Sequence, residues 1–68
     1  MFNQNLLKAK IIEKGVSTLD ICKETGMCEA TFYRKISRDG DFSRFEIEKI
    51  SNVLQLSLVE RNTIFFGS

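Results

Sequence analysis

The stretch from Cys28 to Arg38 holds the side chains of this 68-residue chain that are best suited to binding another molecule. It reads CEATFYRKISR, and from Ala30 onward it carries bases but no acid. If the stretch is a helix, the residues that face away from the apolar Phe32 and Ile36 point to solvent. These solvent-facing positions are Glu29, Ala30, Tyr33, Arg34 and Ser37. Such a face is suited to directional hydrogen bonding with a partner.

Catalysis and metal binding have little support in the sequence. Histidine, the commonest general base and metal ligand, is absent. Cys22 and Cys28 are the two cysteines, and a pair alone is too few for a zinc site. A disulfide between them is not expected in a reducing compartment. We expect Cys22 to be a small core residue, and we expect no enzymatic activity, no metal and no cofactor.

Length and composition indicate one small domain spanning residues 1–68. Apolar residues make up 43% of the chain and charged residues 28%, which is ordinary for a globular protein. No apolar run approaches the roughly 20 residues that span a bilayer, and the N-terminus lacks the apolar stretch of a secretory signal. We therefore expect a cytoplasmic protein without a membrane partner. The net charge of +1 is not that of a nonspecific nucleic-acid binder, and the basic stretch alone could be a solvated face.

Helical periodicity and the signals for helix starts and ends predict an all-α fold. Proline is absent, and apolar residues recur at helical spacing rather than alternating as in strands. We predict five helices, near residues 3–14, 18–25, 28–37, 44–54 and 58–65. Three starts carry a capping box, in which a serine and an acid three residues later each bond the other's backbone N–H. These boxes are Ser17 with Asp20, Ser43 with Glu46, and Ser57 with Glu60.

The second and third predicted helices are separated only by a tight turn. Gly26 stands where the first of the two must end, and glycine takes the left-handed conformation there without a Cβ penalty. Two helices joined so closely must cross at a steep angle, with Ile21 and Phe32 facing the common core. The helix at 28–37 starts without a good cap, because the thiol of Cys28 is a poor hydrogen-bond acceptor.

In these features the chain resembles the Cro/CI-type (lambda-repressor-like, XRE) DNA-binding domains of phages and bacterial transcription regulators. LLKAKIIEKGVSTLDICKETG is similar to the first two helices, MCEATFYRKI to the recognition helix, and FSRFEIEKISNVLQLS to the fourth helix and its exit. The short NTIFF tail is also seen in small phage-type members. The resemblance covers nearly the whole chain, although the family usually places serine at the position of Cys28. It implies a five-helix lambda-repressor-like domain whose second and third helices form a helix-turn-helix.

The resemblance implies that the solvent face of the helix at 28–37 meets base edges in the DNA major groove. Arg34 can bind guanine O6 and N7 together, or else contact a phosphate or remain a surface charge. Tyr33 can reach a phosphate or a thymine methyl, or be partly buried in the core. Ala30 offers only apolar contact. Glu29 either accepts a hydrogen bond from cytosine N4 or stabilises the helix N-terminus beside Cys28.

Phosphate contacts are expected from helix N-termini and from flanking polar or basic residues. The candidates are Thr18, Lys35, Arg38, Ser43 and Arg44. Gly40, in the one loop at 38–42, could let that loop approach the DNA backbone closely. The predicted DNA-binding residues are these five candidates, Thr18, Lys35, Arg38, Ser43 and Arg44, together with Cys28, Glu29, Ala30, Tyr33, Arg34 and Ser37.

The function that the resemblance implies is a small phage or prophage regulator, a Cro-like repressor that binds double-stranded operator DNA. The alternative is a modulator or anti-repressor that binds another phage repressor. With no second domain in these 68 residues, any homodimer on DNA would form through this domain itself. The C-terminal segment SLVERNTIFFGS has more apolar residues than one short helix can bury, so Phe65 or Phe66 could face a partner subunit.

Overall fold

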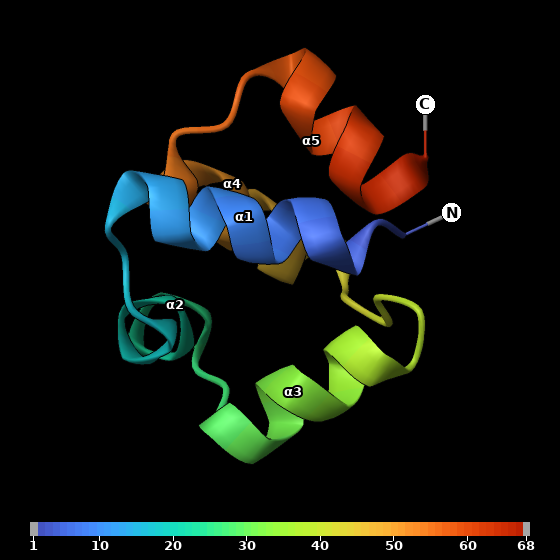
Figure 1. Cartoon of the computed structure of the whole chain (residues 1–68). Helices are drawn as coiled ribbons and strands as arrows, with labels where there is room; N and C mark the ends of the chain where they lie inside the picture. Colours follow the sequence, from blue (N-terminus) through green and yellow to red (C-terminus); the bar gives the residue numbers. More distant parts are fainter. Residues whose placement is uncertain (1, 68) are drawn as a thin grey trace.

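The computed structural model describes residues 2–67, and within that range the chain forms five α-helices and no strand. The prediction of an all-α fold is confirmed, with each helix boundary within about one residue of its expected place. Figure 1 shows their arrangement. The helices are α1 (Gln4–Lys14), α2 (Thr18–Thr25), α3 (Glu29–Ser37), α4 (Arg44–Leu54) and α5 (Leu58–Phe66).

All three predicted capping boxes are present, which explains why the helix starts could be read from the sequence. At α2 the hydroxyl of Ser17 accepts from the backbone N–H of Asp20 at 3.1 Å, and the Asp20 carboxylate accepts from the Ser17 N–H at 3.2 Å. The boxes at Ser43 and Ser57 have the same reciprocal bonds. The α3 N-cap, Cys28, makes no side-chain capping bond.

One apolar core joins all five helices. Its fully buried side chains are Leu7, Ile21, Phe32, Ile50, Leu54 and Ile64. Cys22 is 6% exposed and belongs to the same cluster, which confirms that it is a small core residue. The expectation that Ile21 and Phe32 share the core is also confirmed. Because α2 and α3 both contribute to this core, the orientation of α3 is fixed by packing rather than by the turn alone.

An aromatic cluster closes the core beneath the loop between α3 and α4. The ring of Phe42 lies 5.8 Å from Phe32, 5.9 Å from Phe65 and 5.9 Å from Phe2, measured between centroids. Gly40 (φ +73°) lies against Phe2, whose ring carbons would collide with any Cβ at this position. This close approach is internal, so the structure provides a reason for Gly40 other than the predicted contact with DNA.

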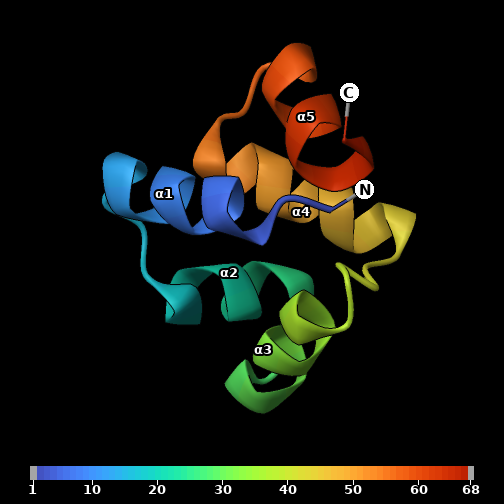
Figure 2. The ribbon, with the colours of Figure 1, turned by 45° about the vertical axis from the view of Figure 1, so that its right-hand side comes forward.

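The α2–α3 unit and α5 occupy opposite ends of the molecule. Figure 1 looks along the axis of α2 while α3 lies across the view, so these two helices cross steeply, as expected. α2 packs against α4, and Figure 2 shows α3 and α5 on opposite sides of that layer. The outer face of α3 is therefore covered by none of the other four helices.

The C-terminal helix buries a different set of residues from the one expected. Of the two phenylalanines considered for a partner surface, Phe65 does not qualify, because it is buried at 8% exposure and its ring packs against Phe2 and Phe42. Phe66 is 56% exposed, and Leu58 and Val59, at 64% and 74%, are more exposed still. No helix among the described residues is long and apolar enough to cross a membrane.

Candidate nucleic-acid interface

Helix α3 is anchored by one face and open on the other. Phe32 and Ile36 are 0% and 4% exposed and hold the helix to the core. The residues predicted to point outward are all exposed: Glu29, Ala30, Tyr33, Arg34 and Ser37. The structure therefore brings these residues to one uncovered face, which we call the α3 face. Their contact with DNA stays a prediction.

Tyr33 links α3 to the start of α2. Its phenol oxygen lies 3.2 Å from the hydroxyl of Thr18, and its ring meets Phe32 edge-on with centroids 5.7 Å apart. Tyr33 nevertheless remains 49% exposed. The interpretation that Tyr33 is partly buried thus holds, because one edge of its ring packs on the core, and its contact with DNA stays a prediction. The bond also places Thr18, a predicted phosphate contact, beside the α3 face.

Arg34 and Arg38 are exposed guanidinium groups on and next to the α3 face. Neither forms an ion pair with any described residue, so each can make a new charge-assisted bond without breaking an old one. Acids also stand near them: Glu29 in the first turn of α3, and the exposed Asp39 and Asp41 in the following loop. The electrostatics of this region are therefore mixed, not uniformly positive.

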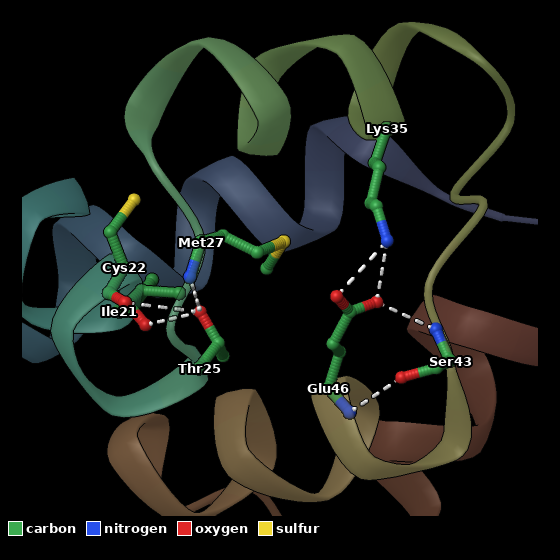
Figure 3. A network of polar contacts seen from close by, with 7 residues as sticks. All are labelled: Ile21, Cys22, Thr25, Met27, Lys35, Ser43 and Glu46. Carbon is green, nitrogen blue, oxygen red and sulfur yellow. Dashed lines mark hydrogen bonds and ion pairs between the residues drawn. The ribbon is translucent and has the colours of Figure 1, made fainter.

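Lys35 differs from the other predicted phosphate contacts, because its ammonium is already paired. It lies 2.8 Å and 3.0 Å from the two carboxylate oxygens of Glu46 on α4, as Figure 3 shows. The two side chains are only 22% and 13% exposed. Burial raises the pKa of Glu46, but hydrogen bonds from Lys35 and from the Ser43 N–H outweigh it and lower that pKa. The structure thus gives Lys35 a positioning role between α3 and α4.

Ser43, Arg44 and Ser37 keep part of their hydrogen-bonding capacity. The hydroxyl oxygen of Ser43 accepts from the Glu46 N–H at 3.2 Å, which leaves its proton for an outside acceptor. The side chain of Arg44 is 95% exposed, and its Nε lies 3.9 Å from a carboxylate oxygen of Glu48, so this ion pair is loose. The hydroxyl of Ser37 donates to the Tyr33 and Arg34 carbonyls at 3.1 Å and 3.0 Å, so outward it can only accept.

Cys28 presents an exposed thiol at the N-terminus of α3. Its Sγ lies 3.2 Å from the hydroxyl oxygen of Thr31. That hydrogen bond, together with backbone N–H groups of the first turn, lowers the pKa of the Cys28 thiol. Glu29 follows it in the same turn, where its negative charge is favoured by the helix dipole. No group of three or more metal-ligating side chains occurs in the described range, residues 2–67.

The turn between α2 and α3 has an anchor that sequence reasoning missed. The hydroxyl of Thr25 donates to the Ile21 carbonyl at 2.8 Å and accepts from the Met27 N–H at 3.4 Å (Figure 3). Gly26, between them, adopts φ +78°, as predicted. A threonine directly before a helix-ending glycine was the available signal. The bonds tie the last turn of α2 to Met27, the residue before the α3 N-cap.

Comparisons with protein-family models, with curated proteins and with solved structures gave no match to this chain. What the fold and the site define together is an all-helical domain with one helix whose outer face is polar and uncovered.

Proposed function

We propose that this protein is a sequence-specific DNA-binding regulator of transcription that inserts α3 into the major groove of operator DNA. The observation that carries the proposal is the α3 face: polar and small side chains on a helix whose other side is fixed in the core. In this proposal α2 and α3 act as a helix-turn-helix, of the lambda-repressor-like kind that the sequence resembles. Such a helix needs a rigid support, because base readout depends on side chains held at fixed positions.

We assign each side chain of the interface to a base or a phosphate by whether its charged or polar group already has a partner within the protein. Arg34 has an unpaired guanidinium on the α3 face and is assigned to guanine, whose O6 and N7 accept its fork together. Arg38 and Arg44 flank that face as exposed cations and are assigned to phosphates, with the hydroxyls of Thr18 and Ser43. Lys35 is assigned to α4 rather than to DNA, since its ammonium already bonds Glu46.

Selection from a random pool of DNA duplexes tests sequence-specific binding without knowledge of the operator. The proposal predicts enrichment of one short consensus that includes a guanine. Arg34→Ala should lose the preference for one base pair, whereas Lys23→Ala, an exposed lysine of α2, should leave the consensus unchanged. A pool that stays random after repeated rounds with the unaltered protein would contradict sequence-specific binding.

The second candidate function is a modulator that binds another repressor through the same face. The observation that favours it is charge: Glu29, Asp39 and Asp41 lie around the α3 face, and the whole chain carries only +1. Acids next to a DNA backbone are repelled, whereas a basic protein partner would attract them. A complex with a second repressor that forms in the absence of any DNA binding would support this alternative.

A further inference from the structure

A groove runs between α4 and α5, apart from the α3 face. It consists of two adjacent hollows of about 590 and 380 Å³, which share Glu48 and Arg61 as lining residues. The first hollow has apolar walls from Phe42, Ile47 and Phe66, and the second from Leu56 and Leu58. Each hollow thus has apolar side chains in addition to the shared Glu48 and Arg61.

Two hydrogen-bonding groups at this groove are unsatisfied within the described part of the chain. The Nε of Arg61 and the hydroxyl of Ser51 are buried and have no hydrogen-bond partner there. Ser51 is 7% exposed and lines the second hollow, and Arg61 lines both. A buried donor without an acceptor costs free energy, and the cost is larger when the donor is charged. An acceptor that enters the groove would remove this cost.

We propose that this groove binds a segment of a partner protein in which an acidic side chain stands between apolar side chains. A carboxylate matches the guanidinium fork, because its two oxygens can accept from Nε and one terminal nitrogen together. Since Nε is covered when the groove is empty, the guanidinium of Arg61 turns toward the groove on binding. The flanking apolar side chains fill the two hollows.

The charge around the groove favours an acidic occupant over a basic one. Arg44 and Arg61 line it together with one acid, Glu48, and that acid is oriented toward Arg44 at 3.9 Å. A second copy of this chain and a small free carboxylate are the other conceivable occupants, and the experiment separates them.

The groove does not depend on the proposed contact between α3 and DNA. α5 lies at the end of the molecule opposite α3 in both Figure 1 and Figure 2. A partner seated along α5 therefore leaves the α3 face open, although it would contact Arg44, which lines the first hollow and is also assigned to a phosphate. Binding at the groove is tested without DNA, so its outcome does not depend on whether the proposed function is correct.

The test is an NMR titration of the ¹⁵N-labelled protein with two blocked tripeptides, acetyl-Leu-Glu-Leu-amide and its neutral match acetyl-Leu-Gln-Leu-amide. The proposal predicts saturable shifts of the Arg61 Nε–H signal and of the amides of Ser51 and Leu58 with the acidic peptide. The glutamine peptide should bind at least several-fold more weakly, and sodium acetate should leave Leu58 unshifted. Equal binding of the two peptides, or no saturable shift with either, would overturn the proposal.

Variants separate a binding role of Arg61 from a structural one. Arg61→Lys keeps the positive charge but loses the two parallel N–H donors of the guanidinium, so the affinity for the acidic peptide should fall several-fold. Thermal melting checks that this variant is folded. Lys23→Met, at an exposed position of α2 that lines neither hollow, should leave peptide affinity unchanged. Concentration-dependent shifts at the groove in the absence of peptide would show that a second copy occupies it, and would also overturn the proposal.

Discussion

The ammonium of Lys35 on α3 forms hydrogen bonds of 2.8 Å and 3.0 Å with the two carboxylate oxygens of Glu46 on α4. Glu46 also accepts from the Ser43 N–H at 2.8 Å, so one carboxylate both caps α4 and holds α3. Lys35→Met should therefore lower the free energy of unfolding by about 1–2 kcal/mol, because it leaves a mostly buried carboxylate without its cation. Urea denaturation measures this, with the exposed Lys23→Met as the matched control.

The same substitution distinguishes a positioning role from a phosphate contact. If Lys35 only joins α3 to α4, Lys35→Met should leave the slope of log affinity against log salt unchanged. A lysine that neutralises a phosphate would instead reduce that slope by about 0.9. A reduced slope together with an unchanged free energy of unfolding would show that Lys35 contacts a phosphate.

Arg34 is the side chain expected to read a base. Arg34→Ala should cost roughly 1–3 kcal/mol of binding free energy and relax the preference at one base pair. Competition binding against operators substituted at each position measures both effects. Uniform weakening across all sequences would assign Arg34 to a phosphate, and an unchanged affinity would remove it from the interface.

Cys28 is an exposed N-cap without a capping bond, whereas α2, α4 and α5 each begin with a bonded serine. Cys28→Ser should therefore raise the free energy of unfolding by roughly 0.5–1 kcal/mol. Ser57→Cys provides the matched reverse change and should lower it. Thermal and urea unfolding of both variants decide the matter, and a clear loss of stability in Cys28→Ser would contradict the capping argument.

Glu60 ties α5 to α1 and gives stability a pH dependence. The hydrogen bond from Lys10, followed by one from the Ser57 N–H, lowers the pKa of Glu60 from its usual 4.5 to about 2. Because the folded pKa lies below the unfolded one, this stabilisation is complete above about pH 4.5 and is lost as pH falls toward 2. Glu46, whose pKa is also lowered, adds to the loss in the same direction.

Glu60→Gln should accordingly reduce the difference in urea midpoint between pH 7 and pH 3. Glu24→Gln, at an exposed position of α2, is the control and should keep the difference seen in the unaltered protein. An equally steep acid loss in Glu60→Gln would show that other carboxylates govern the transition.

Assembly on DNA is a further expectation. One recognition helix contacts only a few base pairs, so specific regulation favours two copies on a two-fold operator with half-sites about 34 Å apart. Sedimentation should show mainly monomer at micromolar concentration, and operator titration should be cooperative. Non-cooperative one-to-one binding to a single asymmetric site would argue against the paired arrangement.

Local signals could be read from the sequence, and contacts between distant elements could not. Ser17 and Asp20 stand one helical turn apart, so their capping box follows from sequence spacing and predicts where α2 begins. The outward residues of α3 followed in the same way from the positions of Phe32 and Ile36. The pairing of Lys35 with Glu46 depends on how α3 and α4 pack, and no local pattern contains that information.

The C-terminal residues illustrate the same limit. Phe65 and Phe66 are adjacent and chemically identical, so composition cannot decide which of them faces inward. Their exposures of 8% and 56% are set by where α5 rests against the aromatic cluster. The contact between Gly40 and Phe2 likewise could not be predicted, because the two residues are far apart in the sequence.

The most direct test of the central claim is an electrophoretic shift with the DNA beside the protein's own gene, compared with unrelated DNA of equal length over a range of salt concentrations. The account predicts tighter binding to the first DNA, with log affinity falling linearly with log salt by about 0.9 per phosphate contacted. Absence of binding to the neighbouring DNA at low salt, or equal affinity for both DNAs at every salt concentration, would contradict it.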